Sequence, residues 1–166
     1  MQPIIGLDPL ALGLATNVPQ WRLGSAGLYD DPVQGTKSYL YGSSVGVQTL
    51  GQVCVEGVAG VWSPVTTALS APGTVGGHGT RVGVAQFAAT AGQFGWYQVF
   101  GTCTALTAGA VAIGTRLNTT ATAGAIDDDG TAGARVILGA VFKTAVAGAQ
   151  VGADCRLVYP SIGLTI

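Results

Sequence analysis

Residues 94–101 read Phe94-Gly-Trp-Tyr-Gln-Val-Phe-Gly101, and this stretch decides the fold class. Side chains alternate between the two faces of a β-strand, so Trp96 and Phe100 fall on one face and Tyr97 and Val99 on the other. Both faces therefore carry large apolar groups, as in strands that are covered on both sides. The stretch predicts a strand at the centre of a sheet.

The rest of the chain after residue 36 contains further short segments rich in Val, Ile, Tyr and Trp, bounded by Gly, Ala and Thr. Such segments predict strands, and helical periodicity is weak throughout. The expected strands are residues 37–41, 52–56, 61–65, 81–88, 95–100, 111–115, 135–142 and 155–159. Trp62, Trp96 and Tyr159 are expected in the core, because aromatic side chains dominate the buried area of small β-domains.

A short motif of the form Ala-Gly followed by a small residue recurs between these segments, as in residues 107–111, 122–126 and 131–135. Its glycine can adopt a positive φ and turn the chain tightly at little steric cost. The spacing of the motif is not constant, whereas a solenoid needs a fixed period. We therefore expect an all-β fold, a small β-barrel or β-sandwich built as a meander with glycine-rich turns, and keep a β-solenoid as the alternative.

Residues 1–36 differ from the remainder, because prolines at positions 3, 9, 19 and 32 leave no room for a helix of ordinary length. The segment is also too apolar for a solvated coil. We predict an extended N-terminal arm over residues 1–36 and a β-barrel-like domain over residues 37–166. The barrel itself, a sister subunit or a foreign surface could cover the arm. The residues expected to contact a partner are Ile4, Ile5, Leu7, Leu10, Leu12, Trp21, Arg22, Leu28 and Tyr29.

The composition excludes several function classes. Only 9% of the residues are charged, against about 25% in ordinary proteins, and the chain contains 27 glycines. So few charges predict self-association or attachment to a large assembly. The formal net charge is −1 and the basic residues are scattered, so nucleic-acid binding is not expected. Glycines and glutamines interrupt the uncharged residues 82–115, so no membrane helix is expected there, and the N-terminus lacks the basic region of a secretory signal.

No motif supports catalysis. Residues 42–46, Gly-Ser-Ser-Val-Gly, match the nucleophile elbow of hydrolases, with Ser44 as the nucleophile. His78 is the only histidine, and all acidic residues after Ser44 except Glu56 follow it, against the order Ser, acid, His. His78 itself lies in the turn-rich residues 71–80, which predict a surface loop. We expect no enzyme activity.

Metal and cofactor sites are likewise not expected. Residues 127–130, Asp-Asp-Asp-Gly, lack the alternating acidic spacing of a calcium loop, and we interpret them as a solvated turn. Cys54, Cys103 and Cys155 are widely spaced with no Cys-x-x-Cys pair, which predicts small buried thiols rather than a zinc site. Whether any two of them pair is left open.

The stretch Arg81-Val-Gly-Val-Ala-Gln-Phe-Ala88, followed by residues 94–101, resembles a segment of tailed-bacteriophage capsid decoration proteins, also called cement or head-stabilising proteins. Residues 50–55, 106–117 and 156–160 are similar to neighbouring strands of that family, so the resemblance covers about residues 37–162. It implies a small barrel, commonly a homotrimer, bound to the major capsid protein at three-fold or quasi-three-fold positions. The implied location is the capsid exterior of the virion, after synthesis in the host cytoplasm.

The resemblance also implies a use for the arm, which in such proteins lies along capsid subunits or neighbouring trimers. This chain departs from the family in its long apolar arm and in residues 71–80. Three alternatives remain: a head-fibre, tail-fibre or other adhesive β-module that recognises a host glycan, an enzyme, and a bacterial surface-layer or shell protein. Glycan binding by the isolated protein would favour the first.

Overall fold

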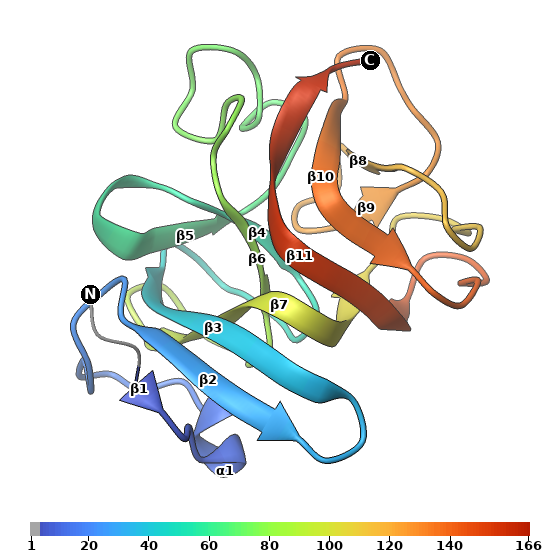
Figure 1. The fold of residues 1–166 in the computed structure, drawn as a ribbon. Helices are drawn as coiled ribbons and strands as arrows, with labels where there is room; N and C mark the ends of the chain where they lie inside the picture. Colours follow the sequence, from blue (N-terminus) through green and yellow to red (C-terminus); the bar gives the residue numbers. More distant parts are fainter. Residues whose placement is uncertain (1–3) are drawn as a thin grey trace.

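The structure, a computed structural model, describes residues 4–166 and confirms the all-β fold class. Its strands form one mixed sheet (Figure 1). The elements are β1 (Ile4–Ile5), α1 (Pro9–Leu12), β2 (Ala26–Asp31), β3 (Gly35–Ser44), β4 (Val53–Glu56), the 3-10 helix η1 (Val58–Gly60), β5 (Val61–Pro64), β6 (Val82–Ala85), β7 (Phe94–Leu106), β8 (Leu117–Thr119), β9 (Ile126–Asp127), β10 (Arg135–Phe142) and β11 (Val151–Thr165).

Five strands close a ring, which we call the N-terminal ring: β3, β5, β4, β6 and β7. β3 and β5 pair in parallel, and the remaining pairs, β5–β4, β4–β6, β6–β7 and β7–β3, are antiparallel. Side chains that point inward fill it, with Trp62 stacked on Tyr97 at a centroid distance of 4.5 Å and Phe87 edge-on to Tyr97. Gly42 makes room for Trp62, since a Cβ at Gly42 would lie 2.2 Å from the indole Cδ1. The ring is thus a packed barrel without a lumen.

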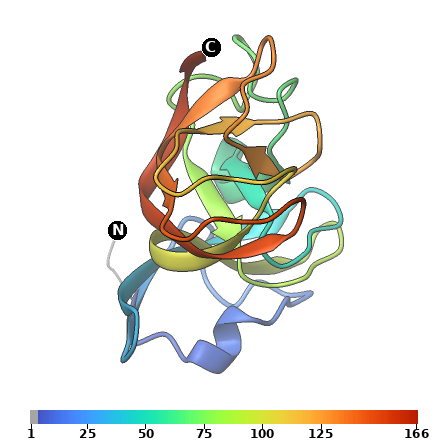
Figure 2. The same cartoon turned by 90° about the vertical axis from the view of Figure 1, so that its right-hand side faces the viewer.

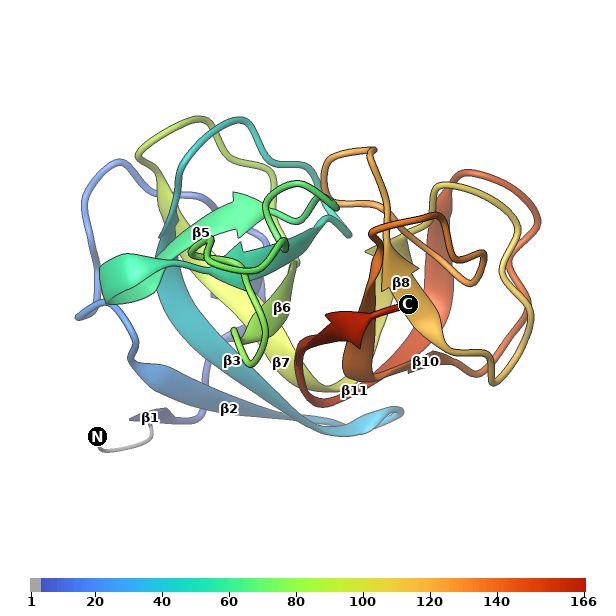
Figure 3. The same cartoon turned by 90° about the horizontal axis from the view of Figure 1, so that it is seen from above.

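The second half of the chain adds a further set of strands to the far half of β7. β11 pairs with β7, β10 with β11, β8 with β10 and β9 with β8. The residues that follow β7 lie beside β9, where the Ala108 amide donates to the Ile126 carbonyl at 2.9 Å. Figure 3 shows the resulting two lobes side by side, with β7 and β11 passing between them.

One apolar core joins the two lobes. Val53 and Val82, which point out of the N-terminal ring, belong to the same buried cluster as Leu117, Ile137 and Phe142 of the second lobe. Because this core is shared, the two lobes are parts of one folding unit.

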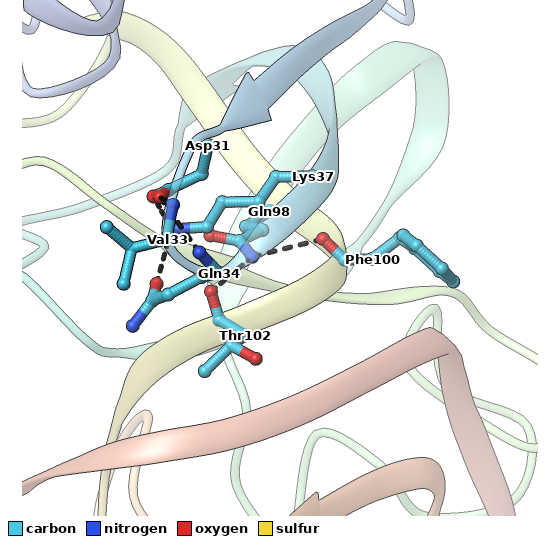
Figure 4. Close-up of polar contacts among 7 residues, drawn as sticks. All are labelled: Asp31, Val33, Gln34, Lys37, Gln98, Phe100 and Thr102. Carbon is cyan, nitrogen blue, oxygen red and sulfur yellow. Dashed lines mark hydrogen bonds and ion pairs between the residues drawn. The ribbon is translucent and has the colours of Figure 1, made fainter.

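The length of β7 depends on a bend at Gly101, where φ is +92°. The buried Gln98 amide spans the bend, since its Nε2 donates to the Phe100 carbonyl at 3.0 Å and to the Thr102 carbonyl at 2.9 Å (Figure 4). A Cβ at Gly101 would lie 2.8 Å from the Thr36 carbonyl oxygen. Only glycine satisfies both the backbone conformation and the close approach of β3. The bend lets one strand serve both lobes.

Gly101→Ala is expected to destabilise the chain by about 2–3 kcal/mol, because it combines a strained positive φ with a steric clash. Gly148→Ala is the matched control, since Gly148 has a similar φ of +88° and nothing lies within 4 Å of its added Cβ. That variant should lose only about 1 kcal/mol. Urea unfolding of both variants measures the difference, and equal losses would contradict the role of the bend.

Seven of the eight expected strands are confirmed, but residues 111–115 are not a strand. Val111 makes a single bridge to Val146, and turns follow it. The apolar Val-Ala-Ile run there resembles a strand, yet Ile113 is exposed. The structure also places β2 within residues 1–36, where it pairs with β3 along its whole length, so the boundary predicted after residue 36 falls inside β3.

Candidate docking surface

The N-terminal residues fold back over the outer face of the N-terminal ring. The Asp8 carboxylate caps α1 by accepting from the Leu10 amide at 2.9 Å. Leu7 packs against Gly27, where a Cβ would lie 2.3 Å from the Leu7 Cδ1. Figures 1 and 2 place α1 and these residues, in blue, at the end of the molecule opposite the C-terminus.

An aromatic cluster forms where this segment meets β3 and β7, and we call it the arm cluster. Half-buried Trp21 packs on it, with ring centroids 5.2 Å from Tyr41 in an edge-on arrangement and 5.1 Å from Trp96. Burial raises the pKa of the Tyr39 phenol well above its usual range. The members are Leu7, Leu12, Trp21, Leu23, Tyr29, Tyr39, Tyr41, Phe94 and Trp96.

A pocket of about 350 Å³ opens beside the arm cluster, and we call it the arm pocket. It is lined by Ala11, Leu14, Thr16, Gln20, Trp21, Tyr41, Phe94 and Trp96. Its polar groups are few: the Tyr41 hydroxyl accepts from the Gln20 amide at 3.0 Å, and the buried Trp96 Nε1 has no hydrogen-bond partner among the described residues. The pocket is therefore suited to apolar or aromatic side chains.

Exposed apolar side chains lie at the arm pocket and next in sequence to its lining: Leu14 lines the pocket, Leu10 precedes the lining residue Ala11, and Val18 falls between the lining residues Thr16 and Gln20. Leu10 is 78% exposed, Leu14 61% and Val18 65%. Three large apolar side chains beside an aromatic pocket form the kind of patch that marks an interaction site. The arm pocket and these three side chains together are the candidate docking surface.

The structure divides the residues that the sequence predicts as partner contacts. Leu7 and Leu12 are buried in the arm cluster of the same chain, so the protein's own barrel covers them. Trp21, Leu28 and Tyr29 are half-buried, whereas Leu10 and Arg22 are exposed. Ile4 and Ile5 form β1, and their side chains lie outside the described part of the structure.

Sequence reasoning did not place Leu14 and Val18 at this surface. Both lie in the apolar residues before Pro19, but no periodic pattern distinguishes outward from inward side chains in an extended segment.

A second exposed aromatic group lies on β11 and β7, and it corrects the prediction that Tyr159 is a core residue. Tyr159 is 62% exposed and stacks on Phe100 at a centroid distance of 5.3 Å, with the Arg156 guanidinium 5.8 Å from the Phe100 ring. Its φ of +46° is rare for a bulky residue and turns its side chain away from the core. The predictions for Trp62 and Trp96 are confirmed, since both are buried.

The β2–β3 turn holds a carboxylate that makes an ion pair and two backbone hydrogen bonds (Figure 4). Lys37 Nζ lies 2.9 Å from Asp31 Oδ2, and Asp31 Oδ1 accepts from the amides of Val33 and Gln34. The Lys37 ammonium first, and then these two amides, lower the pKa of Asp31 from 3.8 to about 2.

This carboxylate predicts a pH dependence. Because the folded pKa of Asp31 is depressed, its contribution to stability is complete above the unfolded pKa and is lost as pH falls through the folded pKa. The thermal midpoints of wild type and Asp31→Asn should therefore differ by a constant amount above about pH 5 and converge near pH 2. Asp30→Asn is the control. It removes an equal charge next to Asp31, from a carboxylate that accepts a hydrogen bond from Thr36 Oγ1. A constant difference down to pH 2 would contradict the assignment.

The remaining motif residues have structural surroundings. Ser44 ends β3, and its buried hydroxyl donates to the Thr90 carbonyl at 2.6 Å. His78 is exposed in a loop, as predicted. Asp129 and Gly130 are exposed, as a solvated turn predicts, but Asp128 in addition holds the neighbouring loop, because its carboxylate accepts from the Ala112 amide at 2.8 Å and from Thr115 Oγ1. The Ala112 amide is the main cause of the lowered pKa of Asp128.

Within residues 4–166 no cluster of three or more His, Cys, Asp or Glu side chains is arranged to hold a metal ion. The same residues contain no helix with the length and hydropathy needed to cross a membrane. Comparison with protein-family models, with curated proteins and with solved structures found no match.

Proposed function

We propose that this chain is a structural subunit that binds the exterior of a tailed-phage capsid and stabilises the expanded head. Its partners are the major capsid protein and further copies of itself, as a homotrimer at three-fold or quasi-three-fold positions. Its location is the capsid exterior of the virion, after synthesis in the host cytoplasm, and its action needs no catalysis, cofactor or metal.

The observation that carries the proposal is the apolar surface around the arm pocket. Leu10, Leu14 and Val18 expose large apolar side chains on a protein of which only 9% of the residues are charged. Exposure of such a surface to water is unfavourable, and an assembly that covers it removes this exposure. The resemblance of residues 37–162 to decoration proteins supports a phage head as that assembly.

The mechanism is adhesive. A subunit that binds only the intact, expanded lattice of capsid proteins lowers the free energy of that state. It therefore opposes opening of the capsid shell. An interface of about 1,600 Å² in total, typical of stable complexes, would suffice for attachment. The arm, folded on its own barrel, presents a preformed surface, which reduces the entropy lost on docking.

The test uses the purified full-length chain and expanded phage heads that lack it. We expect saturable co-sedimentation and a higher temperature of DNA release from the heads. No binding, or binding with no effect on heat resistance, would contradict the proposal.

A second candidate function rests on the exposed Tyr159 ring, which stacks on the half-buried Phe100 ring beside Arg156. An exposed aromatic face with an adjacent hydrogen-bond donor is suited to a host glycan, as in an adhesive β-module of a fibre. Glycan-array binding that Tyr159→Ala abolishes would favour this candidate over the first.

A further inference from the structure

Two of the three cysteines lie directly opposite each other on neighbouring strands. Cys155 of β11 pairs with Cys103 of β7, and the antiparallel register continues regularly through Arg156 with Thr102 and Leu157 with Gly101. Residues opposite each other in an antiparallel pair project to the same face. Their Cα atoms are about 4.5–5.5 Å apart, within the range of about 4.4–6.8 Å that a disulfide requires.

The two thiols also share one buried environment. Both belong to the apolar core that joins the two lobes. Burial, and then the hydrogen bond with the Cys155 side chain, raise the pKa of the Cys103 thiol well above its usual range. The two side chains therefore lie within hydrogen-bonding reach of each other.

Cys54 is set apart from this pair. It lies on β4, opposite Pro64 and Gly83, and its side chain belongs to the buried cluster inside the N-terminal ring that contains Trp62. Its thiol donates weakly to the Gln52 carbonyl at 3.6 Å. The fold thus favours one of the three possible pairings.

We propose that Cys103 and Cys155 form an intramolecular disulfide when the chain is exposed to an oxidising medium. With oxidised glutathione as the oxidant, one cysteine thiolate attacks the glutathione disulfide and releases one glutathione thiolate. The second cysteine then attacks the mixed disulfide and releases the other. Two protein thiols are oxidised, and one glutathione disulfide is reduced to two thiols.

The bond would join β7 to β11 and close a loop of residues 104–154, which contains β8, β9 and β10. Closing a loop of this length restricts the unfolded chain and should raise the thermal midpoint by roughly 5–15 °C. Disulfides persist outside cells and on virions and are reduced in the cytoplasm. The inference does not depend on the proposed function, and a virion protein would meet the oxidising medium on release.

The raised pKa of Cys103 predicts the kinetics. Because the thiolate is the attacking species, oxidation of the folded protein should be slow at neutral pH and faster at alkaline pH. Burial does not raise the thiol pKa in the unfolded chain, so refolding from the reduced, unfolded chain avoids this slow oxidation.

The test refolds the full-length chain in a buffer of reduced and oxidised glutathione, blocks the remaining thiols by alkylation and digests with trypsin. We expect residues 82–116 linked to residues 144–156, with alkylated Cys54 in residues 38–81. The oxidised sample should melt at a higher temperature than the reduced one. Cys54→Ala should retain both results, and Cys155→Ala should lose both.

Three alkylated cysteines after oxidative refolding, or a link that contains Cys54, would overturn the proposal. An unchanged melting temperature in a fully linked sample would overturn the stabilising effect. The peptide map of the wild-type chain decides the pairing even if a variant does not fold.

Discussion

The triple variant Leu10→Asp, Leu14→Asp and Val18→Asp is expected to bind expanded heads at least about 100-fold more weakly than the wild-type chain. Burying a large apolar side chain contributes about 1.5–3 kcal/mol, and about 2.7 kcal/mol corresponds to 100-fold in affinity. The introduced carboxylates would in addition have to be desolvated in an apolar interface. Co-sedimentation at increasing protein concentration measures the loss.

The same variant should fold normally, because the three side chains are exposed in the free chain. Its urea midpoint should stay close to that of the wild type, since surface substitutions usually change stability by less than about 0.5 kcal/mol. Val75→Asp is the matched control, an exposed valine in the loop between β5 and β6 at the opposite end of the molecule (Figure 1). Equal weakening by the triple variant and by Val75→Asp would contradict the docking surface.

Trp62→Ala is expected to lower the free energy of unfolding by about 3–5 kcal/mol, the largest effect on stability that the fold predicts. The Trp62 indole is fully buried inside the N-terminal ring and stacks on Tyr97 with an interplanar angle of 11°. Gly42 and Gly83 lie against its two edges, so neither neighbour has a side chain that could fill the cavity. Urea unfolding of the full chain measures the loss.

Trp62→Phe separates packing from polarity in this prediction. The buried Trp62 Nε1 has no hydrogen-bond partner among the described residues, and phenylalanine removes this unpaired donor. The variant keeps an aromatic ring against Tyr97 and should lose less than about 1.5 kcal/mol. Losses of equal size for the alanine and phenylalanine variants would show that Trp62 does not stabilise the ring by packing.

The strands were predictable where one alternating pattern coincides with one strand. Residues 94–101 have apolar groups on both faces, and β7 lies between β3 and β6 on one side of its bend and beside β11 on the other. The ring closure was not predictable, because the parallel pairing of β3 with β5 joins segments that each read as an ordinary strand. The prediction of a strand over residues 111–115 was wrong for a related reason, since a short apolar run does not reveal whether a partner strand lies beside it.

The candidate site was predictable only in part. The apolar character of residues 1–36 indicated that something covers them, but hydrophobicity does not distinguish Leu7, which the chain buries itself, from Leu10, which it exposes. The difference arises from Asp8, whose cap turns the chain into α1. Tyr159 was misplaced because a positive φ cannot be inferred from a tyrosine before a proline.

Electron cryomicroscopy of expanded phage heads mixed with the chain tests the proposed function most directly, because it shows whether and where the chain binds and which end it presents. We predict barrel-shaped density on the outside of the expanded head, in groups of three at three-fold or quasi-three-fold positions, with the end that carries α1 against the capsid. Density absent from the head surface, or attached through the end that carries the C-terminus, would contradict the account.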